Sequence, residues 1–224
     1  MKRAGAALID LDGTLLDTAP DLAAAANATL VELGLRALAP ETVRDFVGQG
    51  IVNLVRRCVE TGLGRVPEDA MLEAALRRFG EHYERHNGSS TIVYAGVREG
   101  LAALRARGVR LACVTNKAAR FTRPLLAATG LDGYFDAVVT SDEVGRRKPD
   151  PEPFLHACRA LGAAPADTVV IGDSANDAQG ARAAGCRIYL VPYGYREGRA
   201  LRAIDCDGIV DSLLHAADLF SNQS

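Results

Sequence analysis

Apolar runs alternate with amphipathic segments along most of the chain. Short apolar runs that end at polar or glycine residues predict strands at residues 6–10, 109–115, 136–141, 168–173 and 187–191, with a weaker one at 208–210. Segments with apolar residues three and four positions apart, ended by glycine, predict helices at 96–108, 118–130 and 151–162. Strands rich in Val and Ile that alternate with helices are typical of a parallel sheet covered on both faces. The pattern therefore predicts a Rossmann-like, doubly wound α/β core.

One interval breaks the alternation. From about Ala19 to Asn87 the sequence contains no convincing strand and predicts helices punctuated by prolines and glycines. An all-helical block between the first strand and the rest of the sheet is best explained as an inserted cap. The predicted division is an α/β core at residues 1–17 and 90–224 and a helical cap at residues 18–89, linked near residues 16–18 and 88–94.

Charge and composition argue against some classes of protein. The chain has 26 Lys and Arg against 28 Asp and Glu, a net charge of −2, so no overall field favours nucleic acid or an anionic membrane. No apolar run approaches the length of a membrane span, and Asp10 and Asp12 stand where a signal peptide would be apolar. We therefore predict a cytoplasmic protein.

The cysteines and the apolar pattern bear on the redox state and the oligomeric state. The 5 cysteines are scattered and form no CxxC pair, which predicts reduced, mostly buried thiols. No heptad pattern announces an interface, so a monomer and a homodimer both stay open.

Polar residues gather where the predicted strands end. Asp10 and Asp12 follow the first strand, and "TNK" at residues 115–117 follows the second. Asp173, Ser174 and Asp177 follow the strand at 168–173, and Lys148 stands just before the helix at 151–162. Because parallel strands present their carboxyl ends at one edge of a sheet, these side chains are expected to converge there.

This set of residues favours a metal-dependent anion site. Two carboxylates at the end of a buried strand are costly unless a cation lies between them. Several carboxylates among other oxygen donors are the ligand set of Mg²⁺. A metal, a lysine, a Thr–Asn pair and turn amides together suit a phosphate group. An aspartate beside Mg²⁺ can then attack phosphorus, and a second one can serve as general acid and base.

Four motifs carry a resemblance to a known family. "IDLDGTLLDT", "VTNK", "KPDPEPF" and "VVIGDSANDAQGARAAG" resemble, in order, the motifs of the haloacid dehalogenase superfamily of phosphotransferases. The resemblance covers essentially the whole chain and implies that superfamily's fold, with a helical cap that closes over small substrates.

The resemblance also implies roles for particular residues. Asp10 would be the nucleophile, Asp12 the general acid and base, and Lys148 the cation that holds nucleophile and phosphate. Thr115 and Asn116 would bind phosphate. The implied Mg²⁺ ligands are Asp10, Asp173, the backbone carbonyl of Asp12 and, as an outer or alternative ligand, Asp177.

Within that superfamily the chain resembles the bacterial phosphoglycolate phosphatases. The likeness rests on "TAPDLAAAANATLVELGL", on "VRDFVGQGIVNLVRR" and on "VPYGYREG" at residues 191–198. It implies hydrolysis of a small phosphorylated metabolite, 2-phosphoglycolate. The carboxylate of that substrate needs a cation or amide donors, for which Lys117, Arg44 and Arg56 are candidates.

Other interpretations stay open at this stage. The "GQG" of residues 48–50 is not a dinucleotide fingerprint, because Asn53 replaces the third glycine and no strand precedes it. It is either a turn between helices or a cap loop in which Gln49 meets the substrate. The function could also be hydrolysis of another sugar or amino-sugar phosphate, or a phosphomutase reaction. A binding module without catalysis and a dehalogenase are disfavoured by the intact Asp10 and Asp12.

Overall fold

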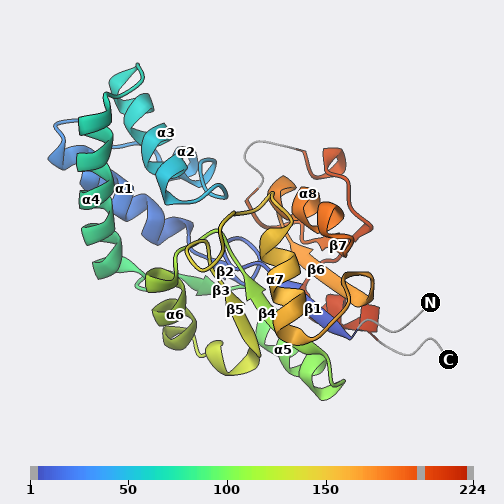
Figure 1. Cartoon of the computed structure of the whole chain (residues 1–224). Helices are drawn as coiled ribbons and strands as arrows, with labels where there is room; N and C mark the ends of the chain where they lie inside the picture. The colour runs from blue at the N-terminus through green and yellow to red at the C-terminus, as the bar shows by residue number, and fades with distance from the viewer. Residues whose placement is uncertain (1–4, 196–199, 221–224) are drawn as a thin grey trace.

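The computed structural model describes residues 5–195 and 200–220 and contains a six-stranded, fully parallel sheet (Figure 1). In order across the sheet the strands are β5 (Ala137–Val139), β4 (Arg110–Val114), β1 (Ala6–Ile9), β6 (Thr168–Gly172), β7 (Arg187–Leu190) and β8 (Gly208–Ile209). All six occur where apolar runs predict them. The α/β fold is thus confirmed. The last residues of the 191–198 segment, 196–198, lie outside the described residues.

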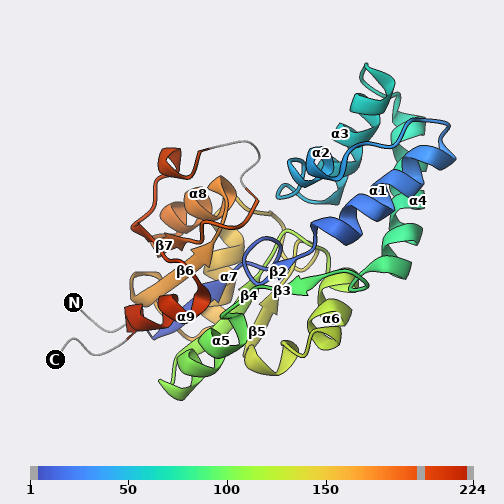
Figure 2. The same cartoon turned by 180° about the vertical axis from the view of Figure 1, so that it is seen from behind.

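Helices cover both faces of the sheet, which explains why β1 is apolar at every position. Ala7 and Ile9 pack into one apolar cluster with α5, α6 and α9, while Ala6 and Leu8 pack into another with α7 and α8. Figure 1 shows α7 and α8 in front of the sheet, and Figure 2 shows α5 and α9 in front from the other side. The bounds are α5 (Val97–Ala106), α6 (Ala119–Ala128), α7 (Glu152–Leu161), α8 (Ala175–Ala184) and α9 (Leu213–Ala216).

All regular elements of the inserted region are helices, as predicted, and they supply most residues of a separate apolar cluster. Its helices are α1 (Ala19–Glu32), α2 (Pro40–Arg44), α3 (Ile51–Leu63) and α4 (Asp69–His86). The pattern at residues 40–62 divides into two helices, because α2 ends at Arg44 and α3 begins after Gly50. Gly48 and Gly50, in the segment between them, take positive φ angles of 133° and 83°, which suit glycine. The "GQG" segment is thus a connection between α2 and α3, and both of its glycines line the cavity described below.

Two short strands that the sequence did not predict connect the helical region to the sheet. β2 (Leu16–Asp17) pairs antiparallel with β3 (Ile92–Val93), so the outgoing and returning links lie side by side. A two-residue strand is too short to be predicted from an alternation of apolar and polar residues. They fall within the predicted links. Four short 3-10 turns complete the described elements: η1 (Asp132–Tyr134), η2 (Pro165–Asp167), η3 (Leu201–Ala203) and η4 (Ala217–Phe220).

Asp21, in the first turn of α1, ties the two links together. Its buried carboxylate accepts hydrogen bonds from the backbone N–H groups of Gly88 at 2.9 Å and Ser90 at 2.8 Å, and from the Thr91 hydroxyl at 2.7 Å. A buried carboxylate with several donors is well compensated for its loss of water. The start of the helical region is thereby held against its end.

We expect Asp21→Ala to lower the free energy of unfolding by about 2–4 kcal/mol, because the donors from Gly88, Ser90 and Thr91 lose their buried acceptor. Urea denaturation measures this loss. Asp69→Ala is the matched control, since Asp69 is an exposed acid in the first turn of α4, and its loss should cost less than about 1 kcal/mol. Equal losses in the two variants would contradict the role given to Asp21.

Candidate active site

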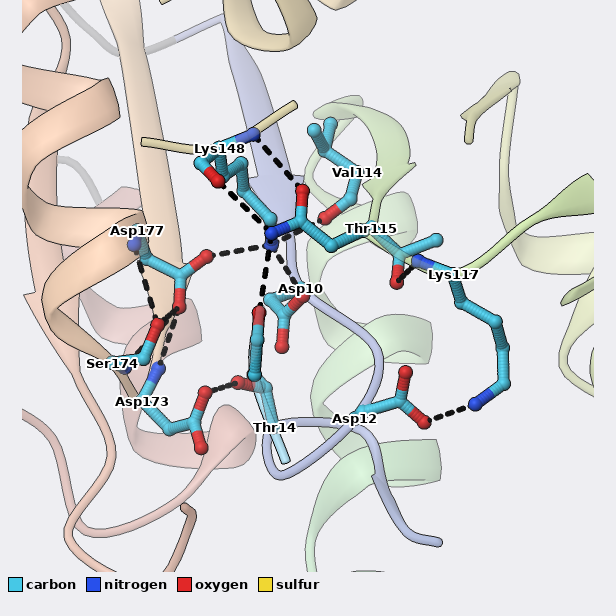
Figure 3. Close-up of polar contacts among 12 residues, drawn as sticks. Asp10, Asp12, Thr14, Val114, Thr115, Lys117, Lys148, Asp173, Ser174 and Asp177 are labelled. Carbon is cyan, nitrogen blue, oxygen red and sulfur yellow. Dashed lines mark hydrogen bonds and ion pairs between the residues drawn. The ribbon is translucent and has the colours of Figure 1, made fainter. Parts of the chain in front are cut away.

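The polar residues at the strand ends converge as predicted. The central strands β4, β1 and β6 are neighbours, and the residues that follow them meet at the carboxyl edge of the sheet, where they line a cavity beneath the helical region. Figure 3 shows these side chains together with Lys148. The lining from the sheet side consists of Asp10, Asp12, Thr115, Asn116, Lys117, Lys148, Asp173, Ser174, Asp177 and Tyr195.

Lys148 lies at the centre of the cluster. Its Nζ donates to Asp10 Oδ1 at 2.5 Å, to Asp177 Oδ1 at 2.7 Å and to the Val114 carbonyl at 2.9 Å (Figure 3). Its side chain is only 4% exposed. Burial lowers the pKa of Lys148, but the two carboxylates outweigh burial and raise it above its usual range. Lys148 is therefore a charged, immobilised partner of Asp10.

Three buried carboxylates form a candidate metal centre. Oxygens of Asp10, Asp173 and Asp177 lie within 4.8 Å of one another, near the ~4 Å that separates opposite ligands of an octahedral Mg²⁺. Burial raises the pKa of Asp10 to about 7 although Lys148 opposes the rise, and burial with the neighbouring carboxylates raises the pKa of Asp173. Mutual repulsion of the neighbouring carboxylates thus adds to the effect of burial on both pKa values.

The charge balance of the lining fits a divalent cation. Four carboxylates face the ammonium groups of Lys117 and Lys148, which leaves an excess of two negative charges in a largely buried site. Such an excess is costly in a medium of low dielectric constant. The donors are all oxygens on the acidic side of the site, which is the ligand type of Mg²⁺. The residues present therefore fit a bound Mg²⁺.

Asp177 is also part of a helix cap. Its Oδ2 accepts from the Ser174 hydroxyl at 2.6 Å and the Ser174 N–H at 3.2 Å, while the Ser174 hydroxyl accepts from the Asp177 N–H at 3.3 Å. This is a capping box at the start of α8. With Oδ1 held by Lys148, both oxygens of Asp177 have partners in the protein. That arrangement suits an outer position around a metal.

Asp12 points away from the other carboxylates (Figure 3). Its Oδ1 accepts from Lys117 Nζ at 2.7 Å and from the Thr18 hydroxyl at 2.6 Å. Burial lowers the pKa of Lys117, but Asp12 outweighs it and raises that pKa. Lys117 also lies 5.1 Å from the ring centre of Tyr83 in α4. The sequence predicts Lys117 as a substrate contact; the structure places it in the cavity lining, paired with Asp12.

Thr115 and Asn116 lie at the predicted edge of the sheet. In this structure their side chains form hydrogen bonds with other residues of the protein. The Thr115 hydroxyl accepts from the Lys117 N–H at 3.1 Å. Asn116 accepts from the Lys148 N–H at 2.9 Å and donates to the Lys148 carbonyl at 3.0 Å and to the Gly48 carbonyl at 3.1 Å. The Asn116 side chain therefore fixes the Lys148 loop and contacts the helical region, a use that sequence reasoning did not foresee.

The helical region contributes an apolar roof. Its lining residues are Leu22, Val47, Gly48, Gly50, Ile51 and Leu54. Gln49, named by the sequence as a substrate contact, is exposed and does not line the cavity; its carbonyl accepts from Arg147 at 3.5 Å. Arg56 is exposed, and Arg44 binds Asp17 at 3.2 Å outside the cavity. Of the three cationic residues that the sequence suggests for the substrate carboxylate, Lys117 lines the cavity that the described residues form, and Arg44 and Arg56 do not.

Two residues that sequence reasoning missed also contact the acidic cluster. The Thr14 hydroxyl donates to Asp173 Oδ1 at 3.4 Å, and the Tyr195 N–H donates to Asp173 Oδ2. Thr14 lies within the first motif, "IDLDGTLLDT", so its position in the sequence could have indicated a place at the site. Tyr195 lies after β7, in the "VPYGYREG" segment that carries part of the family likeness, but the sequence predicted no role for it beside Asp173.

The comparison with protein families decides the classification. Residues 7–191 match the model of the haloacid dehalogenase-like hydrolases, a span that includes all the strand-end motifs. The chain belongs to this family. The resemblance inferred from the four motifs is thereby confirmed.

Related proteins resemble this hydrolase over nearly the whole of its length. It is 52% identical over 219 residues to the phosphoglycolate phosphatase of Nitrosospira multiformis, covering 98% of this chain and 96% of that protein. It is 49% identical over 208 residues to the plasmid phosphoglycolate phosphatase of Cupriavidus necator, covering 93% and 89%. A crystal structure of a predicted phosphoglycolate phosphatase from Haemophilus somnus superposes with a TM-score of 0.93 at 30% identity, covering 99% and 100%. The helical region is therefore part of the shared architecture.

None of the helices within residues 5–195 and 200–220 combines the length and apolarity that a membrane crossing requires.

Proposed function

We propose that this hydrolase is a Mg²⁺-dependent phosphatase that converts 2-phosphoglycolate into glycolate and phosphate. The observation that carries the proposal is Asp10, a buried carboxylate held by Lys148 beside two further carboxylates and beneath a small apolar roof. The relatives named phosphoglycolate phosphatase support the choice of substrate.

In the proposed reaction, a carboxylate oxygen of Asp10 attacks phosphorus as the bond from phosphorus to the glycolate oxygen breaks. Asp12 gives its proton to the departing alkoxide. Water then attacks phosphorus of the phospho-aspartate, Asp12 takes the proton of that water, and Asp10 is regenerated. The two carboxylates keep separate roles because Lys148 holds one and Lys117 holds the other.

The proposed ligands of Mg²⁺ are Asp10, Asp173 and the backbone carbonyl of Asp12, with Asp177 in the outer position. When bound, the ion would balance the negative charge of the site and of the phosphate group. Thr14 and Tyr195 would hold the Asp173 carboxylate toward that centre. Thr115 and Asn116 stay proposed phosphate binders at the sheet edge.

The lining of the cavity supports a small anionic substrate. Its roof is made of aliphatic side chains and glycine backbone, which leaves little to bind a sugar with many hydroxyls. Lys117 is proposed to meet the substrate carboxylate, since it is the candidate cation inside the cavity. Closure of residues 18–89 over the core as a separate cap would exclude bulk water. A cytoplasmic location and the oligomeric state stay predictions.

The test is phosphate release from a panel of esters, ranked by kcat/KM. The panel contains 2-phosphoglycolate, several hexose phosphates and an amino-sugar phosphate, each with Mg²⁺ or with EDTA. We expect 2-phosphoglycolate to rank first and EDTA to abolish release. A different ester in first place would overturn the substrate while keeping the chemistry. Isomerised sugar phosphate without release would indicate a phosphomutase.

A further inference from the structure

The hydroxyl group of Tyr195 lies at the first link of the helical region. It accepts hydrogen bonds from the N–H groups of Thr18 at 2.7 Å and Ala19 at 2.9 Å, and it donates to Asp17 Oδ1 at 2.6 Å. Tyr195 follows β7 in the sheet domain, yet its ring packs into the apolar cluster of the helical region and is 3% exposed. A side chain of the core is thus embedded at the base of the cap.

This hydroxyl group takes over the capping of α1. Thr18 is the residue at the N-cap position, but its side chain makes no capping hydrogen bond. The Thr18 hydroxyl donates to Asp12 instead, at 2.6 Å. The first N–H groups of a helix need hydrogen-bond acceptors. The Tyr195 oxygen provides the acceptor that the Thr18 side chain does not provide.

The other end of Tyr195 contacts the acidic cluster. Its N–H donates to Asp173, and the preceding residue, Gly194, passes so close that a Cβ there would collide with the Asp173 carboxylate. The loop therefore rests directly on that carboxylate. One residue joins the proposed metal centre to the first link of the cap.

Arg44 brings the second helix of the cap to the same point. Its guanidinium lies 4.7 Å from the centre of the Tyr195 ring, and its Nη1 lies 3.3 Å and 3.2 Å from the two oxygens of Asp17. A cation over an aromatic face and an ion pair both add attraction. Because Arg44 belongs to the cap while Tyr195 belongs to the core, a rotation of the cap about its links must separate them.

We propose that Tyr195, Asp17 and Arg44 form a closure latch, which holds the cap over the acidic cluster while the leaving group is protonated. The latch rests on the proposed phosphatase function. Tyr195 is a positioning residue in it, because its hydroxyl acts on the cap link and not on the substrate. Hydrolysis of an ester with a poor leaving group needs the closed cap, whereas p-nitrophenyl phosphate releases a stable anion without a proton.

The first test compares two substrates in Tyr195→Phe. This variant keeps the ring and the N–H to Asp173 and removes only the hydroxyl. We expect the ratio of kcat/KM for 2-phosphoglycolate to that for p-nitrophenyl phosphate to fall about tenfold, the equivalent of one buried hydrogen bond. Arg44→Met, which keeps the Tyr195 hydroxyl and its contacts with the first residues of α1, should lower the same ratio. Tyr189→Phe, on β7 and outside the latch, is the matched control and should leave it unchanged.

The second test needs no substrate turnover, so it separates a failed latch from a failed phosphatase assignment. Hydrogen exchange is measured with Mg²⁺ and inorganic phosphate as the probe. We expect Tyr195→Phe and Arg44→Met to speed exchange at residues 16–24 and at 40–48, while the six strands of the parallel sheet stay protected. Unchanged exchange in these segments, or faster exchange throughout the molecule, would overturn the latch.

Discussion

Asp10→Asn is expected to reduce kcat for phosphate release by about 10³-fold or more, because an amide oxygen is a far weaker nucleophile than the carboxylate that attacks phosphorus. The substitution also replaces one of the three carboxylates offered to the metal by a neutral amide. Initial rates with saturating Mg²⁺ and 2-phosphoglycolate measure the effect.

The fold should survive this change. Asn has nearly the shape of Asp, and burial already disfavours the charged form of Asp10. Lys148 also keeps its hydrogen bond to Asp177. The free energy of unfolding in EDTA should therefore change by less than about 1.5 kcal/mol. A folded Asp10→Asn protein that retains a tenth or more of the activity would contradict the assignment of Asp10 as nucleophile, since such a loss is only about tenfold.

Lys148→Met should have the second largest effect. Removal of the ammonium leaves Asp10 and Asp177 facing each other without their shared cation, so kcat/KM should fall about 10²-fold to 10³-fold. The free energy of unfolding should also fall by about 3 kcal/mol, because two buried charges lose their partner. Phosphate release and urea denaturation measure the two effects.

Arg146→Met is the matched control for that variant. Arg146 lies two residues earlier and pairs with Asp150 on the surface, with a side chain 75% exposed. It should change activity less than twofold and stability by less than about 0.5 kcal/mol. If Lys148→Met behaved like this control, Lys148 could not be the cation that holds the nucleophile.

The sheet and its active edge were predictable because their signals are local. Each strand is a short buried run, and a strand covered on both faces is apolar at every position. Asp10, the residues at 115–117 and Asp173 each follow such a run directly, so parallel strands had to bring them together. Lys148 was found by its motif, although it reaches Asp10 across 138 positions of sequence.

The pairing of side chains within the site could not be predicted in the same way. Lys117 and Asn116 line the cavity as expected, but the sequence did not predict that Lys117 pairs with Asp12 or that Asn116 holds the Lys148 loop. Residue spacing fixes the edge at which a side chain lies, whereas its partner depends on rotamers and on loops from elsewhere. Asp21 and Tyr195 were missed for this reason. Their partners lie 67 or more positions away, in the returning link and in the first link.

The most direct measurement of the proposed mechanism is the stereochemistry of transfer at phosphorus. A phosphorothioate of the preferred substrate, made chiral with oxygen isotopes, is hydrolysed with Mg²⁺ in isotopically labelled water, and the configuration of the product is determined. Attack by Asp10 followed by attack of water inverts phosphorus twice, so retention is expected. Inversion would show that water attacks the substrate directly and would contradict a phospho-aspartate at Asp10.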